Sequence, residues 1–122
     1  MSPGVWAAMA GCGGLGAVAR VVLDLAITQR MRRAFPWGIT VVNMTGSFML
    51  GVLVGASVGS DVLFVAGTGL LGGYTTFSTW MVQTDELGAR GLTGLMLVNW
   101  LGAMAAGLGA AGAGWALGAA LG

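Results

Sequence analysis

The sequence predicts an all-α membrane protein with four transmembrane helices, the third of which is broken in mid-membrane. The first observation is the composition: 57% of the residues are hydrophobic and 7% are charged, whereas a soluble domain carries about a quarter charged residues. The second is the length of the apolar runs, because a helix needs about 20 residues to cross a bilayer. The 122 residues are therefore expected to form one transmembrane subunit, residues 1–122, in the lipid bilayer.

The four predicted spans are separated by short connections. They cover about residues 5–27, 37–58, 62–82 and 92–117. Helices are the default because lipid offers no partner to a free backbone N–H or C=O, and the continuous apolar runs lack the alternation of a transmembrane β-barrel. The connections leave no room for a soluble domain, so any function must lie among the helices.

Glycine is abundant, with 24 copies in the chain, and it is concentrated in the last span, "AAGLGAAGAGWALGAALG". Small residues let helix backbones approach closely in a membrane. This pattern predicts that the fourth span is a packing helix.

Arginines are distributed on one side of the predicted bundle. The first and third connections contain Arg30, Arg32, Arg33 and Arg90, and the opposite side has neither Arg nor Lys. The positive-inside rule places such loops in the cytoplasm. We expect both termini outside, in a multi-pass protein of the plasma membrane. Inside the first span, Arg20 is four residues before Asp24, a spacing at which the two side chains can pair.

Few polar side chains lie at membrane depth, and each is a candidate functional residue because it is costly there. They are Thr40, Asn43, Thr45 and Ser47 on the second span, "TTFST" (residues 75–79) on the third, and Asn99 on the fourth. The Asn43 amide needs a partner, either in a neighbouring helix or in a pore. Thr40 and Ser47 are weaker signals, because a hydroxyl can bond to a carbonyl of its own helix.

The stretch "GGYTTFSTW", residues 72–80, predicts the break in the third helix. Gly72 and Gly73 have poor helix propensity, and the β-branched threonines that follow are also poor helix formers. A break at this depth occurs where backbone is buried in protein or lines a wet cavity. Phe77 and Trp80 share a helical face, and their positive ring edges would attract a small anion if they pointed into a pore.

Three motifs, in this order, resemble those of the small four-helix fluoride channels of the Fluc, or CrcB, family. They are "GGLGAVAR" ending at Arg20, "PWGITVVNMTGSFMLG" around Asn43, and "GGYTTFST". The resemblance extends over essentially the whole chain. It implies an antiparallel, dual-topology-type dimer with two narrow fluoride pathways.

The resemblance also implies site residues. Asn43 and Phe77 correspond to the pore Asn and the first pore Phe, and Trp80 stands where the family usually has a second Phe. Arg20 corresponds to the vestibule Arg. The backbone carbonyls of Gly72 and Thr75 would hold a structural sodium ion (Na⁺) at the dimer centre, which is not transported.

Fluoride is small and strongly hydrated, so a pore must replace its water with donors. The Asn43 amide and hydroxyls such as those of Thr40, Thr76 and Ser78 can do so. On the fourth span, the family's row of Tyr and hydroxyl residues is replaced by Asn99, Ala103 and Gly107.

Several alternatives remain at this point. The partner is either a second copy of the chain or a homologous subunit of opposite orientation; the one-sided arginines and the missing hydroxyls favour the second.

A small multidrug-type exporter needs a membrane carboxylate for proton exchange, and Asp24 is the sole candidate. A purely structural subunit would leave Asn43 and the break unexplained. The sequence shows no basic stripe for nucleic acid and no nucleophile–base pair, metal set or phosphate loop of an enzyme.

Overall fold

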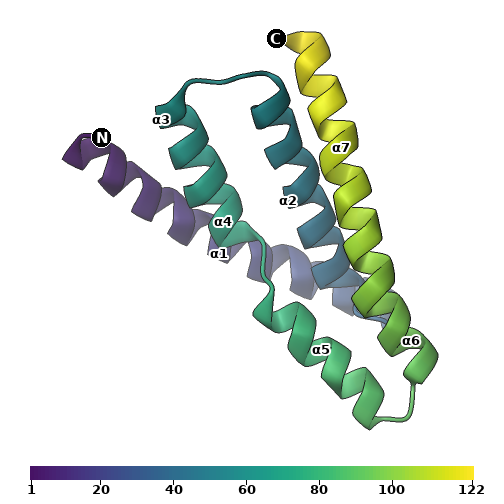
Figure 1. Ribbon diagram of the computed structural model, residues 1–122. Coiled ribbons are helices and arrows are strands. Elements are labelled where there is room, and N and C mark those ends of the chain that lie inside the picture. Colours follow the sequence, from purple (N-terminus) through teal and green to yellow (C-terminus); the bar gives the residue numbers. More distant parts are fainter.

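The computed structural model describes residues 1–122, and the chain is helical throughout, with no β-strand (Figure 1). The elements are α1 (Pro3–Met31), α2 (Trp37–Gly55), α3 (Ser60–Val62), the π-helix η1 (Leu63–Leu71), α4 (Gly72–Tyr74), α5 (Ser78–Ala89), α6 (Thr93–Leu97), the π-helix η2 (Val98–Gly102) and α7 (Ala103–Leu121). α3, η1 and α4 follow one another without interruption, as do α6, η2 and α7. The all-α prediction is confirmed.

The first helix is longer than its predicted span because both of its ends are capped. The Ser2 hydroxyl accepts a hydrogen bond from the Val5 N–H at 3.3 Å, and Pro3 occupies the first turn, where its missing N–H costs nothing. At the other end Arg32 adopts the left-handed conformation, with φ of 45°, and its N–H bonds to the Thr28 carbonyl. The helix therefore covers residues 3–31 instead of 5–27.

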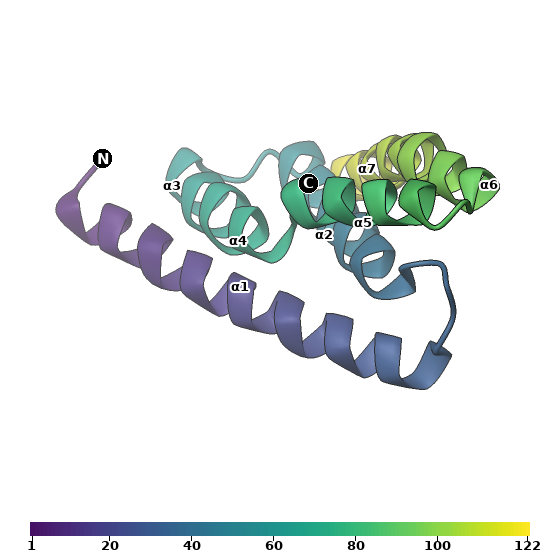
Figure 2. The same ribbon diagram turned by 90° about the horizontal axis from the view of Figure 1, so that it is seen from below.

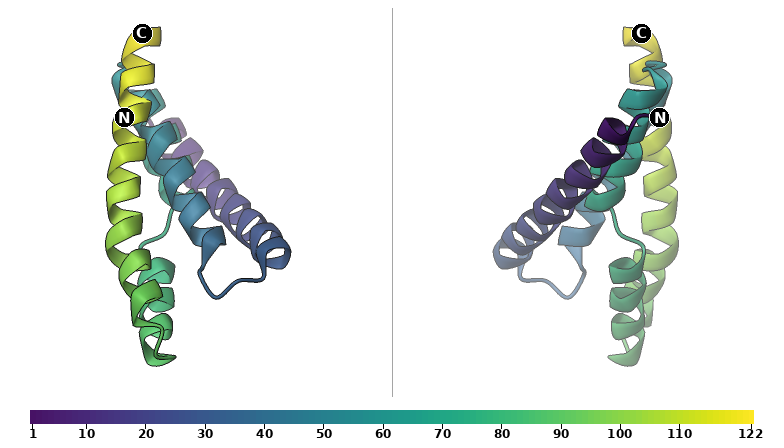
Figure 3. Two further views of the ribbon diagram at one scale, coloured as in Figure 1. Left: turned by 90° about the vertical axis from the view of Figure 1, so that its right-hand side faces the viewer. Right: turned by 90° about the vertical axis from the view of Figure 1, so that its left-hand side faces the viewer.

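Three helical segments are long and apolar enough to cross a membrane: Pro3–Met31, Trp37–Gly55 and Thr93–Leu121. The third predicted span is interrupted between Tyr74 and Ser78. Its two pieces lie in series, from the end of the molecule that holds the termini toward the opposite end (Figures 1 and 3). That they make a fourth crossing together stays a prediction.

The sidedness of the connections agrees with the charge pattern. The C-terminus, the N-terminus and the α2–α3 connection lie toward one end, and the α1–α2 and α5–α6 connections lie toward the other (Figure 3). Those two connections are the ones that contain or adjoin the four loop arginines. The chain thus has all its loop cations at one end.

Glycines bring the backbones of α2 and α7 into contact. A methyl group added at Gly114 would lie 2.0 Å from the Phe48 carbonyl oxygen, and one added at Gly51 would lie 2.2 Å from the Ala111 carbonyl oxygen. Neither backbone could accommodate a side chain at these positions. The prediction that the last span is a packing helix is confirmed, and α1 lies on the opposite side of α2, against η1 and α4 (Figure 2).

The interior of the single chain is small. Its central cluster consists of Val42, Leu71 and Tyr74, with Leu23 and Leu53 packed against it. Only 15 of the 122 residues are buried, so most apolar side chains face outward, toward lipid or toward another protein chain.

Candidate functional site

The helix break begins at Thr75, within the stretch of glycines and threonines that predicted it. Gly72 and Gly73 belong to α4, whereas Thr75 is extended, with φ of −83° and ψ of 160°. Its N–H and its hydroxyl both donate to the Leu71 carbonyl, each at 2.9 Å. A threonine that caps the preceding turn in this way competes with helix continuation, so the helix stops there.

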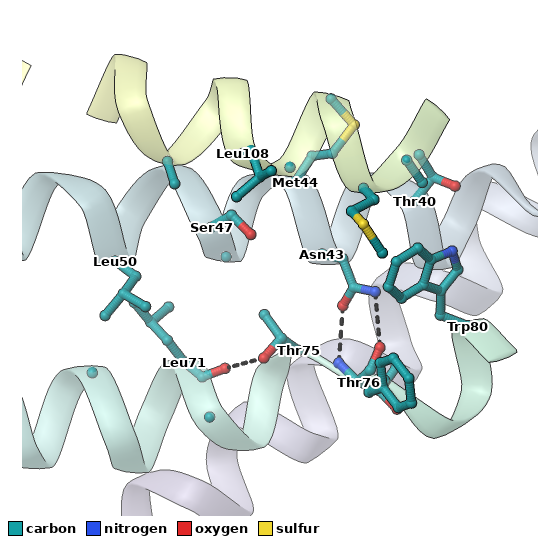
Figure 4. Close-up of a pocket in the computed structure, with 18 residues that line it drawn as sticks. Thr40, Asn43, Met44, Ser47, Leu50, Leu71, Thr75, Thr76, Trp80 and Leu108 are labelled. Carbon is teal, nitrogen blue, oxygen red and sulfur yellow. Dashed lines mark hydrogen bonds between the residues drawn. The ribbon is translucent and has the colours of Figure 1, made fainter. Parts of the chain in front are cut away.

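Asn43 holds the unwound backbone from the side of α2. Its Nδ2 donates to the Thr76 carbonyl at 2.8 Å, and its Oδ1 accepts from the Thr76 N–H at 2.9 Å (Figure 4). The amide thereby replaces the two helical hydrogen bonds that Thr76 lacks, which explains how an asparagine is tolerated at membrane depth. Nδ2 carries two hydrogens, so one N–H of Asn43 is still free.

That free N–H belongs to a residue that lines a cavity of about 410 Å³ between α2, α7 and the break (Figure 4). The cavity brings together most of the predicted site residues: Thr40, Asn43, Gly72, Thr75, Thr76, Phe77 and Trp80. None of its lining residues is charged. An ion in this cavity would therefore be bound by neutral donors or acceptors.

The two sides of the cavity differ chemically. α7 contributes only apolar residues: Ala103, Met104, Gly107, Leu108 and Ala111. The hydroxyls and the amide all come from α2 and from the broken segment. The last span lacks the hydroxyls that the resemblance implies, and the cavity shows the consequence: one wall has no hydrogen-bonding side chain.

Ser47 is a lining residue that the predicted site did not include. It lies one helical turn after Asn43 and therefore on the same face of α2, as this spacing alone could have indicated. Thr40, on the same face, donates its hydroxyl to the Pro36 carbonyl at 3.1 Å, as expected for a hydroxyl that bonds back to its own helix. Ser78 does not line the cavity; its hydroxyl lies 3.5 Å from that of Thr76.

The two aromatic residues form an edge-to-face pair. The ring centroids of Phe77 and Trp80 are 5.7 Å apart, with an interplanar angle of 87°, a favoured arrangement of aromatic pairs. Phe77 is 68% exposed in the single chain. The Trp80 Nε1–H donates to the Asn99 carbonyl, so the polar hydrogen of the indole is not directed into the cavity.

Arg20 does not pair with Asp24, contrary to the expectation from their spacing. Its Nη1 donates to the Thr75 carbonyl at 3.4 Å, and Asp24 accepts from the Thr28 hydroxyl at 3.3 Å. The carbonyl freed by the break is the better-placed acceptor for the guanidinium. Arg20 therefore stabilises the unwound backbone by this hydrogen bond. It is not among the residues that line the cavity.

An all-helical chain with membrane-length apolar helices and an uncharged polar cavity beside a helix break is a multi-pass membrane protein. Residues 7–115 match the family described as CrcB-like protein, Camphor Resistance (CrcB). The chain belongs to this family, as the three motifs indicated.

Curated relatives in bacteria are similar over most of the chain. The "Fluoride-specific ion channel FluC 1" of Symbiobacterium thermophilum is 43% identical over 123 residues, which cover 96% of each chain. That of Leifsonia xyli subsp. xyli is 43% identical over 97% of this chain and 89% of the relative. The "Fluoride-specific ion channel FluC 2" of Mycobacterium tuberculosis is 44% identical over 69% of this chain and 67% of the relative.

Proposed function

We propose that this chain is the pore-forming subunit of a passive, fluoride-selective channel that lets cytoplasmic fluoride leave the cell and so confers fluoride resistance. The names of its relatives support the ion. The observation that carries the proposal is the clamp between Asn43 and the Thr76 backbone, which leaves one amide N–H free on a residue that lines a cavity without charged side chains.

The cavity has the donors that a strongly hydrated anion needs when it loses water. They are the second N–H of Asn43, the Ser47 hydroxyl and the hydroxyls near the break. The ring edge of Phe77 adds a positive quadrupole end without the desolvation cost of a full cation. Neutral donors of this kind suit a channel, because an ion must bind well enough to enter and weakly enough to leave.

The cavity contains no group that could couple transport to protons. No Asp, Glu or His lines it, whereas proton relays in transporters use such residues. Asp24, the carboxylate required by the exporter alternative, lies against α2 at Gly38 and accepts from Thr28. These observations favour a passive channel over a multidrug-type exporter.

A single chain does not enclose the pathway, because Phe77 is mostly exposed and the α7 wall lacks donors. We infer that a second subunit of opposite orientation completes it, in an antiparallel dimer. The partner is a second copy of this chain or a homologous subunit. The grouping of all loop arginines at one end opposes insertion in both orientations and favours the homologous subunit.

Fluoride efflux from liposomes tests the channel and its composition together. The chain is reconstituted alone, and fluoride release is followed with an electrode, with chloride release as the control. Fluoride-selective efflux from the chain alone would support a homodimeric channel and contradict an obligate heterodimer. If the chain alone is silent, we expect co-expression with a homologous subunit of opposite charge bias to produce efflux; silence there too would contradict the channel.

We also propose that the dimer binds a structural sodium ion. The Gly72 carbonyl receives no hydrogen bond from the N–H groups at the break, since those of Thr75 and Thr76 bond to Leu71 and Asn43. The Thr75 carbonyl accepts only from Arg20 and has a second lone pair. Free carbonyl oxygens fit a hard cation, but two are too few to surround one. Gly72 and Thr75 would thus hold Na⁺ together with the partner's oxygens, adding a fixed positive charge at the dimer centre.

We expect removal of sodium to weaken the dimer. An ion that binds only the dimer favours it by mass action, roughly a hundredfold when sodium is present at about 100 times its Kd. The measurement is the dimer fraction by chemical crosslinking at graded protein-to-detergent ratios, in NaCl and in N-methylglucamine chloride. Equal dimer fractions in the two salts would contradict the sodium site without bearing on fluoride conduction.

A further inference from the structure

Asn99 connects the last helical segment to Trp80 through both its backbone and its side chain. It belongs to η2 and is 0% exposed. Its carbonyl accepts from the Trp80 indole N–H. Its side-chain Nδ2 donates to the Thr84 hydroxyl at 2.8 Å and lies 3.5 Å from the Trp80 carbonyl. One residue therefore holds both the ring and the backbone of Trp80.

The orientation of the Asn99 amide is determined by Thr84. The single hydroxyl hydrogen of Thr84 goes to the Trp80 carbonyl at 2.8 Å, so the Thr84 oxygen can only accept from Asn99. Nδ2 must then face Thr84, and Oδ1 points the other way. That oxygen is buried and has no hydrogen-bond partner, which is unfavourable.

The hydrogen bond from the Trp80 indole to the Asn99 carbonyl determines which part of the ring faces the cavity. The indole has one polar hydrogen and accepts no hydrogen bond, so its attachment to Asn99 limits rotation of the ring and withdraws the N–H from the cavity. The remaining carbon surface forms the edge-to-face pair with Phe77. Figure 4 shows Trp80 beside Thr40 and Asn43, at the part of the cavity nearest α5. A freely rotating indole would instead vary the aperture and expose a donor to any anion.

We propose that Asn99 is a positioning residue that holds the Trp80 indole in its pair with Phe77 and thereby determines the selectivity of the pathway for fluoride over larger anions. This role rests on the proposed function. Asn99 itself does not line the cavity; it acts through Trp80. Rejection of a larger anion depends on a fixed aperture. The main-chain carbonyl of Asn99 accepts from the indole N–H, and the Asn99 side chain, through its donors to Thr84 and the Trp80 carbonyl, keeps that carbonyl within reach of the ring.

A double-mutant cycle tests the role in selectivity. Asn99→Leu removes the amide donors at similar volume, and Trp80→Phe removes the indole N–H. In liposomes, we expect Asn99→Leu to lower the fluoride-to-chloride permeability ratio about tenfold, the effect of losing one or two net hydrogen bonds. In the Trp80→Phe background the same substitution should have little further effect. Equal losses in both backgrounds would mean a merely structural role and would overturn the proposal.

A second measurement does not depend on conduction. In ¹⁵N-labelled protein in detergent, the Trp80 indole N–H resonance is assigned by its absence in Trp80→Phe. Leucine keeps the main-chain carbonyl that accepts from the indole N–H but lacks the side-chain donors that hold this carbonyl against α5. We expect Asn99→Leu to loosen the contact, and so to shift the resonance upfield and speed its exchange with solvent. Val98→Ala is the matched control, since Val98 lies in the same π-helix and is 54% exposed; it should leave the resonance unchanged.

The outcomes separate the two proposals. An unchanged Trp80 resonance in Asn99→Leu would overturn the positioning role even if the channel conducts fluoride. Wild-type protein that conducts no fluoride with any partner would overturn the proposed function, while the resonance would still report whether Asn99 holds the indole. If Asn99→Leu does not fold, Thr84→Val removes the intervening hydroxyl, and we expect smaller changes in the same direction.

Discussion

Replacement of Asn43 by Asp is expected to abolish fluoride efflux. The carboxylate could still accept from the Thr76 N–H, but it could not donate to the Thr76 carbonyl. It would also place a negative charge among lining residues that are all uncharged and would repel an entering anion. An uncompensated buried charge costs about 3 kcal/mol or more, and about 1.4 kcal/mol corresponds to a factor of ten. We therefore expect efflux to fall by at least about 100-fold.

Gln29→Glu is the matched control for the change in charge. Gln29 is exposed in the last turn of α1, so the same substitution of amide by carboxylate there should leave efflux close to that of the wild type. Both variants are compared at equal protein content after size-exclusion chromatography. Wild-type efflux from Asn43→Asp would show that the contact between Asn43 and Thr76 only stabilises the fold and that the ion passes elsewhere.

Gly114→Ala is expected to destabilise the chain by disrupting the contact between α2 and α7. The added methyl group would lie 2.0 Å from the Phe48 carbonyl oxygen. A backbone atom cannot move aside as a flexible side chain can, so the two helices must separate. Overpacking typically costs about 1–3 kcal/mol. We expect a lower midpoint of thermal unfolding in detergent, followed by intrinsic tryptophan fluorescence.

Gly112→Ala, on the same helix, is the matched control. A methyl group there would meet no atom within 4 Å, and alanine favours a helix over glycine by about 1 kcal/mol. Its unfolding midpoint should equal or exceed that of the wild type. A similar loss in both variants would mean that glycine content, and not the α2–α7 contact, sets the stability.

Some features followed from the sequence because a membrane leaves few alternatives. Apolar runs of bilayer length in a chain with almost no charge must become helices, and the arginines of two connections on one side orient them. Against that background Asn43 and the "TTFST" cluster are conspicuous, so the residues around the break could be recognised as unusual. Their chemistry also limited the class of site to neutral donors and free backbone.

Other features could not be read from local patterns. The stretch of glycines and threonines predicted a break but not its exact start: Gly72 and Gly73 are helical, and the chain leaves the helix at Thr75, which caps the Leu71 carbonyl while Asn43 binds the next N–H. The spacing allowed Arg20 to pair with its helical neighbour Asp24, but Arg20 bonds to the Thr75 carbonyl. The contacts of Asn43 with Thr76 and of Arg20 with Thr75 join residues far apart in the chain, and local spacing does not reveal them.

The contact between Trp80 and Asn99 is the clearest example of a feature that only the tertiary structure reveals. The sequence marked both positions as departures from the pattern that it resembles, but nothing in it indicated that they touch. The sequence by itself determined the helices, their sidedness and the inventory of polar groups, because these depend on hydrophobicity and local spacing. The tertiary structure decided which polar group satisfies which, because a buried donor or acceptor takes the nearest partner in space, and helix packing places that partner.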